Sequence, residues 1–345
     1  MKNQHSTMIC IVVLSACVWA AFGINHHTKV VKMEKQIVTG TTRPVCAGRF
    51  VLDLPQQAVV TYRRATVAGW EISTTTETDD EFELRIGRKE EQIGSSRNER
   101  DGVSLELVHK FKSNDLHGKI FLYDRKWTGL MRAGKEVVSE SVSIDASVRA
   151  SGISYDFTAQ LRKPEKLQRL EKLLYQLQPV PEGEVPVNPG FCFDRGLLRD
   201  PLTIDDHEYV SVFWGTTEQP DLAGSFSTFA GTKPGQTLLQ RHAASDIQQQ
   251  YAPHFHDLRT GPRVINGVAG EEVLQRVDEL NGVKLQDFMW ESISDEADLS
   301  LPMLTLELST GLGRPGKPVN SSLSDSDALA LWEQISSSLR RRSTR

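Results

Sequence analysis

The sequence of 345 residues lacks the short motifs by which the common hydrolases are recognised. It contains no G-x-S-x-G segment, which places a serine nucleophile on a tight strand-to-helix turn, and no H-E-x-x-H segment, which binds zinc on one helix face. A serine hydrolase or zinc protease would therefore need an unusual arrangement of its catalytic groups. These absences favour a binding protein over an enzyme.

A surplus of positive charge is also missing. The chain has 40 Lys and Arg against 45 Asp and Glu, a net charge of -5 and an isoelectric point near 6.0. Proteins that bind nucleic acid neutralise phosphates with clustered cations, so no nucleic-acid partner is expected. The remaining composition, with 39% hydrophobic and 25% charged residues, is typical of a folded chain long enough for two domains.

Cysteine is scarce, and two of the four cysteines lie in an apolar N-terminal segment. The run from Met8 to Ile24 is almost uninterrupted in apolar character, with Lys2 before it and a polar, cationic stretch after it. Such a run predicts a signal peptide or an N-terminal membrane anchor within residues 1–24, followed by a juxtamembrane linker over residues 25–45. The remainder of the protein would therefore lie outside the cytoplasm.

The fate of this segment has three interpretations. Ala21 and Gly23 are spaced like a signal peptidase site, which predicts cleavage. A segment that is retained would instead tether the protein to the inner membrane. The sequence L-S-A-C ending at Cys17 also fits the box in which a bacterial lipoprotein is lipidated, although the apolar run continues beyond it.

Cys46 and Cys192 are the two cysteines outside the N-terminal segment. In an oxidising compartment, a pair without a third competitor predicts a disulfide. Closing so long a loop would stabilise the fold by about 4–5 kcal/mol in the loop-entropy model. Two separate buried thiols are the alternative. A zinc site is disfavoured because structural zinc takes four ligands at short spacings.

Alternating apolar and polar residues predict half-buried antiparallel strands in both parts of the chain. Clear alternation covers residues 103–111 and 153–161, and further strands are expected at residues 119–127, 138–148, 208–214, 224–229, 283–293 and 303–309. Residues 129–134 are expected to form a turn. Apolar residues at helical spacing predict helices over 167–177, 240–251 and after Ser324, whose side chain can cap a helix.

A linker over residues 179–189 divides the two sets of strands, because its four prolines prevent a continuous helix. We therefore predict an α+β fold of two tandem domains, each a mainly antiparallel sheet with packed helices and a C-terminal helix. The expected domains are residues 46–178 and residues 190–342.

Three histidines are candidates for a chemical site. His254 and His256 flank Phe255, so in a strand both rings would point to one side, and His242 could join them. They could bind a metal or serve an envelope hydrolase with a non-standard site. No acidic or thiol ligand accompanies them at metal-binding spacing, so we expect no metal and no cofactor.

Asp79, Asp80, Glu81 and Glu83 concentrate negative charge in a short stretch. They are candidates for a partner-binding site, because a cationic patch on a protein partner would be attracted to them. The alternative is a solvated acidic loop or strand edge without a binding role.

Several blocks of the sequence together form a recognisable pattern. The first is the segment from Cys46 to Pro55, with Gly48, Arg49 and Phe50, and the second is the segment from Pro189 to Cys192. The later positions are Gly267, Gly270, Glu271, Glu272, Phe288, Trp290, Glu291, Leu304, Leu306, Leu308, Thr310, Gly311 and Trp332. These blocks resemble immunity proteins that are cognate to type VI secretion phospholipase effectors, specifically those of the fourth lipase-effector family. The first block resembles the opening of that family's N-terminal domain, and the second is similar to the start of its C-terminal domain.

The resemblance implies a two-domain α+β protein of the Gram-negative periplasm that binds a lipolytic toxin one to one. Such a protein would protect without catalysis, by holding the lid or covering the active-site entrance of the phospholipase in a cleft between its halves. A disulfide from Cys46 to Cys192 would then fix the angle of this clamp. A membrane-anchored envelope scaffold is a further alternative to the hydrolase already described.

Overall fold

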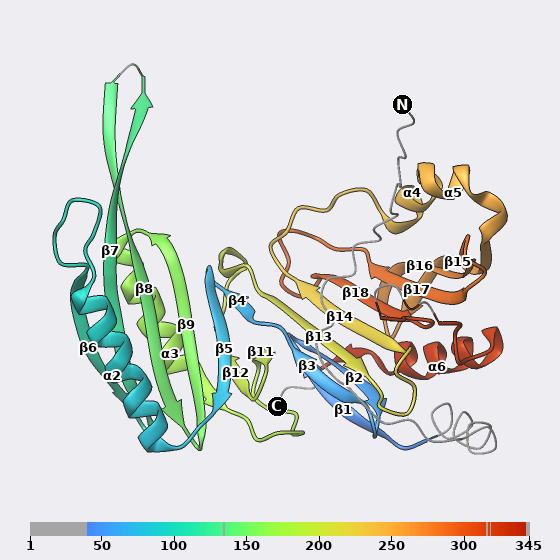
Figure 1. The fold of residues 1–345 in the computed structure, drawn as a ribbon, viewed down its shortest axis with the longest axis horizontal. Coiled ribbons are helices and arrows are strands. Elements are labelled where there is room, and N and C mark those ends of the chain that lie inside the picture. The colour runs from blue at the N-terminus through green and yellow to red at the C-terminus, as the bar shows by residue number, and fades with distance from the viewer. Residues whose placement is uncertain (1–39, 134, 315–316, 318, 343–345) are drawn as a thin grey trace.

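The computed structural model describes residues 40–133, 135–314, 317 and 319–342 (Figure 1). The apolar segment of residues 8–24, with Cys17 and its three interpretations, lies outside the described residues. Among those that are described, no helix is both long and apolar enough to cross a membrane. We refer to residues 40–178 as the first half of the chain and to residues 190–342 as the second half.

Strands dominate both halves. The strands that begin in the first half are β1 (Thr42–Ala47), β2 (Phe50–Pro55), β3 (Val59–Tyr62), β4 (Ala65–Val67), β5 (Trp70–Thr76), β6 (Leu105–Ser113), β7 (Leu116–Arg132), β8 (Lys135–Ala150), β9 (Ile153–Arg162) and β10 (Leu177–Pro179). The second half contains β11 (Gly190–Phe193), β12 (Gly196–Arg199), β13 (Tyr209–Gly215), β14 (Ala223–Phe229), β15 (Phe255–Ile265), β16 (Val268–Asp278), β17 (Lys284–Ser292), β18 (Met303–Ser309) and β19 (Arg340–Arg341). The α-helices are α2 (Asp79–Ser95), α3 (Leu167–Gln176), α4 (Leu238–Ala243), α5 (Asp246–Gln250) and α6 (Asp325–Ser338).

Most strands join one sheet that runs through both halves. In the described part of the chain it has thirteen strands, in the order β15-β16-β17-β18-β14-β13-β4-β5-β9-β8-β7-β6, with β3 also paired to β13. The halves meet where β13 pairs with β3 and β4, for instance through Val212 opposite Tyr62 and Tyr209 opposite Thr66. The sheet therefore continues from one half into the other.

The first-half sheet is covered by a helix on each face (Figure 1). Ile144 and Val148 of β8 alternate toward one face, where they are buried in a core that also contains Leu170 and Leu174 of α3. On the other face lies α2, which begins beside β5 and buries Phe82. The predicted leucine-bearing helix is thus a core helix.

The second-half sheet is covered on one face by α6. The hydroxyl of Ser324 accepts the main-chain N–H of Asp327 at 3.2 Å and so caps the start of this helix. The Trp332 ring packs edge-to-face on Phe288 at a centroid distance of 6.0 Å. Near the opposite face, α4 contacts β16, and the N–H of Leu239 donates to the Glu271 carboxylate at 2.8 Å.

The hairpin of β1 and β2 belongs to the second half in space, although it starts the first half in sequence. The outer edge of β2 pairs with β19, with Arg340 opposite Val51. The fully buried Phe50 ring lies 6.5 Å from the ring of Phe226 in β14. The core of the second half therefore includes side chains from both ends of the described chain.

Most of the predicted elements are confirmed, together with the α+β class. The strand expected over residues 303–309 is β18, and that over residues 153–161 is β9. The turn expected over residues 129–134 is wrong in extent, because β7 continues to Arg132 and β8 starts at Lys135. The helix expected over residues 240–251 is divided into α4 and α5, since Ser245 caps a new helix.

Replacing Phe50 by Ala tests this shared core. We expect a loss of about 3–5 kcal/mol in unfolding free energy, because the ring is fully buried against β14. Hydrogen exchange should show lower protection in β14 and β18 as well as in β2. The control is Val59→Ala, since Val59 is 57% exposed and should change stability little. Loss of protection confined to β1 and β2 would contradict the shared core.

Candidate functional site

The three candidate histidines do not converge on one site. His242 Nε2 lies 3.7 Å from Asp257 Oδ2, and His256 Nε2 lies 3.2 Å from Asp278 Oδ2. His254 Nδ1 instead contacts the main-chain oxygen of Asp278 at 2.6 Å. Across the described ranges no group of three His, Cys, Asp or Glu side chains could hold a metal ion. Each histidine is engaged by its own neighbours, which gives no support to a metal site here.

The acidic stretch forms the first turn of α2. The Thr78 hydroxyl accepts the Glu81 N–H at 3.3 Å, and the Glu81 carboxylate accepts the Thr78 N–H at 2.8 Å. This capping box satisfies two helix-end donors, and the main-chain hydrogen bond from Thr78 lowers the pKa of Glu81. The Arg149 guanidinium donates to Asp79 and lowers the pKa of its carboxyl. Asp79 and Glu81 therefore have structural roles.

The alternative of an acidic loop or strand edge is wrong, because these residues start a helix of seventeen residues. Two signals in the sequence could have revealed it. Thr78 is followed three residues later by Glu81, which is the pattern of a capping box. Phe82, Ile86 and Ile93 are then spaced to lie on one helix face, and all are buried. Asp80 and Glu83 are exposed on this helix and remain the candidates for meeting a partner.

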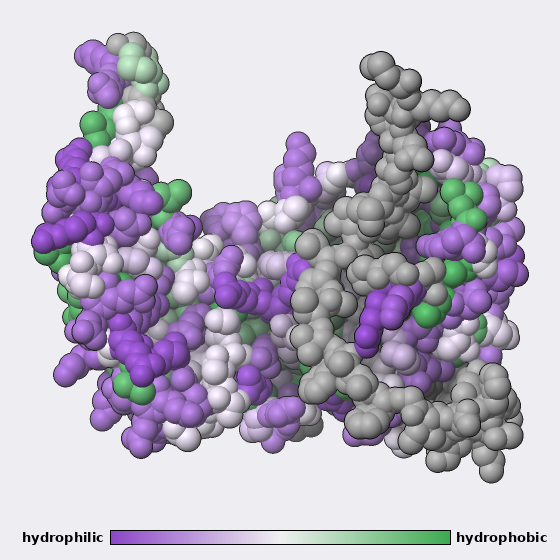
Figure 2. Space-filling model, viewed as in Figure 1, coloured by the Kyte–Doolittle hydropathy of each residue, from purple (hydrophilic) through white to green (hydrophobic). Residues whose placement is uncertain are grey.

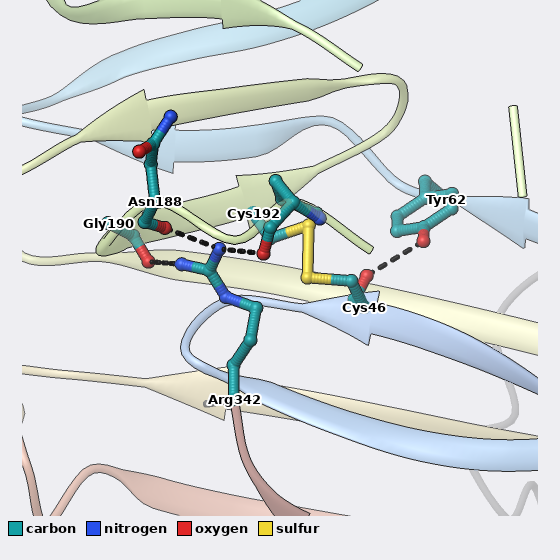
Figure 3. Close-up of a disulfide and its surroundings, with 7 residues drawn as sticks. Cys46, Tyr62, Asn188, Gly190, Cys192 and Arg342 are labelled. Carbon is teal, nitrogen blue, oxygen red and sulfur yellow. Dashed lines mark hydrogen bonds between the residues drawn. A yellow bond between two sulfur atoms is a disulfide. The ribbon is translucent and has the colours of Figure 1, made fainter. Parts of the chain in front are cut away.

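Cys46 and Cys192 form the disulfide that the sequence predicts, with a Cα–Cα distance of 6.0 Å (Figure 3). It joins the end of β1 to β11 and is buried. Two main-chain hydrogen bonds lie beside it: Gly48 N–H donates to Cys192 O at 2.7 Å, and Cys192 N–H donates to Gly48 O at 2.9 Å. The Tyr62 hydroxyl donates to Cys46 O at 2.7 Å. Covalent and main-chain bonds thus hold the start of each half together.

Arg342 fastens the linker to the same place. Its guanidinium donates to the main-chain oxygens of Pro186 at 2.8 Å, Asn188 at 2.7 Å and Gly190 at 2.6 Å (Figure 3 shows the last two). Its own N–H donates to Arg49 O at 2.9 Å. Three main-chain carbonyls between Pro186 and Gly190 thus accept hydrogen bonds from one guanidinium. Carbonyl oxygens only accept hydrogen bonds, so they could not pair with one another.

Arg49 lies in the turn between β1 and β2 and fastens this hairpin to two carboxylates of the second half. It forms paired hydrogen bonds with Asp200 at 2.8 and 3.0 Å and with Glu208 at 2.7 and 3.0 Å. Burial raises the pKa of Glu208, whose side chain is 3% exposed. Burial also acts against the charge on Asp200, but the Arg49 guanidinium outweighs it and lowers the pKa of Asp200. We call the disulfide with Arg49, Asp200, Glu208 and Arg342 the lock.

The distal part of the β7–β8 hairpin projects from the first half (Figure 1). We call residues 126–133 and 135–141 the arm. In Figure 2 the outline of the molecule is hollowed between the arm and the rest of the protein, and we call this concavity the hollow. The sheet continues from one side of the hollow to the other, and the lock fastens the β1–β2 hairpin to the second half.

Two family models match the chain in sequence. Residues 43–178 match the N-terminal domain of Tle cognate immunity protein 4, and residues 184–344 match its C-terminal domain. The chain belongs to this family of immunity proteins. The resemblance noted in the sequence is thereby confirmed, and so is a two-domain architecture for the Tle cognate immunity protein 4 family.

Solved structures of immunity proteins share the fold. The apo immunity protein TplEi of the type VI secretion system from Pseudomonas aeruginosa matches with a TM-score of 0.73 and 25% identity, covering 89% of this chain and 100% of that one. The immunity chain in a Tle4–Tli4 complex matches with a TM-score of 0.72 and 25% identity, covering 88% of this chain and 98% of that one. Among curated proteins, none matches the chain.

Membership in the Tle cognate immunity protein 4 family decides between the functional alternatives. The family consists of inhibitors without enzymatic activity, so the hydrolase with a histidine site and the envelope scaffold are both set aside. An immunity role together with a buried disulfide also places the protein outside the cytoplasm.

Replacing Arg49 by Met tests the lock. The change leaves the buried Glu208 without its cation and should cost about 3–5 kcal/mol of unfolding free energy near neutral pH. Without Arg49, burial holds the folded-state pKa of Glu208 further above its unfolded value. The loss is therefore small below the unfolded pKa and grows as the pH rises toward the folded value.

Urea denaturation of wild type and Arg49→Met at about pH 5 and pH 8 measures this difference, which should be larger at the higher pH. The double variant Arg49→Met/Glu208→Gln is the control, because it removes the buried charge together with its partner. An equal loss at both pH values would show that Glu208 is not the group left unpaired.

Proposed function

We propose that this chain binds a type VI-secreted phospholipase one to one in the periplasm and blocks it by covering its lid or active-site entrance. The observation that supports this most strongly is the match over both halves to a family whose fold has been solved in a Tle4–Tli4 complex. The blocking mechanism and the stoichiometry are our inference from the shape and the rigidity of the chain.

An inhibitor that covers the lid or active-site entrance needs a large, stable contact with the enzyme and no catalytic group of its own. A phospholipase acts when its lid opens and an apolar entrance meets the membrane. A protein bound over that region keeps phospholipid from the nucleophile, provided that it competes with the membrane. This favours an interface on the order of 2,000 Å² or more and nanomolar affinity. We assign this interface to the hollow and its rim (Figure 2).

The lock supports this assignment because a preformed surface loses little freedom on binding. If the two halves rotated freely, binding would have to fix their orientation, and the conformational entropy lost in doing so would reduce the affinity. Here Arg49 and the disulfide fix the β1–β2 hairpin to the second half. From the arm-bearing sheet and its helix, the Tyr155 hydroxyl donates to Arg195 O at 2.7 Å and Arg169 donates to Asp206 at 2.6 Å. Binding can therefore proceed with little movement of the two halves relative to one another.

The acidic start of α2 is a proposed steering element rather than the centre of the interface. Asp80 and Glu83 are both exposed on the first turns of α2, where a partner can reach them. Exposed charges mainly change the rate of association and its salt dependence. A cationic region of the phospholipase near α2 would benefit from them.

Tethering is a further part of the proposal. A retained apolar segment over residues 8–24 would hold the antidote at the inner membrane, and a lipidated Cys17 would do so through an acyl anchor. Either anchor raises the local concentration of the protein at the surface where a phospholipase acts. Cleavage would instead leave the protein free in the periplasm.

A titration tests the proposed function. The oxidised protein from residue 36 onward is added to a phospholipase assay with the lipase encoded beside this gene. We expect activity to fall linearly to zero near one equivalent, because a nanomolar inhibitor binds stoichiometrically at micromolar enzyme. Heat-denatured protein is the control. Unchanged activity without detectable binding would contradict the proposal for that pair.

Charge reversal tests steering by α2. We expect Asp80→Lys/Glu83→Lys to slow association with the lipase by about tenfold at low salt, and by less at high salt because ions screen exposed charges. Stopped-flow or surface plasmon resonance gives the rate. The matched control is Glu182→Lys/Glu184→Lys in the exposed linker. Equal rates for both variants would remove α2 from the binding surface.

A further inference from the structure

The arm is a two-stranded ribbon, and no other strand or helix of the described residues forms a layer against it. Strand pairing continues from Lys126 opposite Ser141 to Arg132 opposite Lys135, a length of roughly 20 Å. Neither of the flanking strands follows it, since β6 pairs with β7 only up to Tyr123 and β9 pairs with β8 only from Val142. Isolated two-stranded ribbons are only marginally stable in water. The exposure of this ribbon therefore needs a reason.

Apolar side chains gather toward the tip of the arm. Met131 is 73% exposed, Val138 is 55% exposed and Val137 is 45% exposed. Directly opposite residues share a face, and here Gly129 pairs with Val138, while Met131 pairs with Glu136. Met131 and Val138 are therefore diagonal neighbours on one face, and Trp127 lies on the same face closer to the base.

The base of the arm is fastened by charged and aromatic contacts. Arg125 donates to Glu106 at 2.6 Å and to Glu140 at 2.7 Å, which ties both strands of the arm to β6. Trp127 Nε1 donates to Glu140 at 3.0 Å, and the Arg100 guanidinium lies 3.8 Å from the centroid of the Trp127 ring. These contacts fasten the base of the ribbon, whereas Met131 and Val138 farther along remain exposed.

A lipid surface is a poor occupant for this tip. Both long edges of the ribbon carry main-chain N–H and C=O groups that no third strand of the described chain pairs. In hydrocarbon each such group would be left unsatisfied at a cost, which is why open sheet edges do not insert into bilayers. The Glu136 carboxylate beside Met131 adds to that cost.

A protein recess satisfies the same groups. Polar atoms or strand edges of a protein can pair with the ribbon edges, while an apolar wall covers Met131 and Val138. The proposed partner has such a recess by its chemistry, because an enzyme that cleaves phospholipids must accept acyl chains. The arm stands at the rim of the hollow, so its tip is continuous with the surface assigned to the phospholipase (Figure 2).

Resting on the proposed function, we propose that the tip of the arm, through Met131, Val138 and Val137, inserts into the acyl-chain recess of the bound phospholipase. The tip would take the place of substrate acyl chains, while the rest of the hollow covers the surrounding surface. The fastened base lets the arm enter without first becoming ordered, which preserves affinity.

The test compares Met131→Asp/Val138→Asp with Val264→Asp/Leu280→Asp, a control pair that is 67% and 68% exposed on β15 and the loop after β16. Binding to the lipase encoded beside this gene is measured by calorimetry. We expect the tip variant to bind at least about 100-fold more weakly, as for the loss of central apolar anchors, and the control to bind like wild type. Equal melting temperatures verify the fold.

A competition measurement separates recess binding from a peripheral contact. A short-chain lysophospholipid should weaken binding of the wild type and should have little further effect on the tip variant. Unchanged affinity of the tip variant, or no competition with wild type, would overturn the inference while the proposed function stands. Failure of wild type itself to bind would instead count against the proposed function.

Two further experiments test whether the tip instead binds a lipid bilayer or a second copy of this chain. Flotation with phosphatidylglycerol and phosphatidylethanolamine vesicles that depends on Met131 and Val138 would assign the tip to lipid and overturn the inference. Light scattering that shows a dimer of the wild type and a monomer of the tip variant would assign it to a second copy and overturn it as well.

Discussion

The pairing of the first strands with the second half is the constraint on which the rest of the structure depends. β2 lies between β1 and β19, β3 pairs with β13, and Phe50 packs on Phe226. The second half therefore has no complete core without the start of the chain. The lock reinforces this placing of the hairpin, while β4, which pairs with both β13 and β5, continues the sheet toward the arm.

This construction suits the proposed inhibition, in which the protein competes with a membrane for the phospholipase. Affinity depends on how much of the contact energy remains after the partners have been ordered. A continuous sheet joins the arm to the second half through β8, β9, β5 and β4, and β4 meets β13 where Thr66 lies opposite Tyr209. The buried Arg49–Glu208 pair adds charge-assisted hydrogen bonds that fasten the β1–β2 hairpin within the second half.

Local features of the fold could be predicted from sequence, and long-range ones could not. Tyr155 and Phe157 alternate with polar residues, so β9 is evident, and Ser324 marks the start of α6. The pairing of β3 with β13 could not be predicted from residue composition or from the spacing of apolar residues, because strands that pair across a long stretch of sequence need no matching motif. The arm could not be predicted for another reason. Exposed side chains such as Met131 and Val137 lie on its two opposite faces, so the residues beyond Trp127 show no alternation of apolar and polar residues.

The exchange of strands also determines when the protein becomes complete during synthesis. β2 is made early, but its neighbour β19 at Arg340–Arg341 is among the last described residues to be made. A growing chain therefore cannot close the second-half core until nearly all of it has been released, and contacts so distant in sequence form slowly. A chain whose synthesis stops before α6 and β19 therefore lacks part of the second-half core and the strand that pairs with the outer edge of β2.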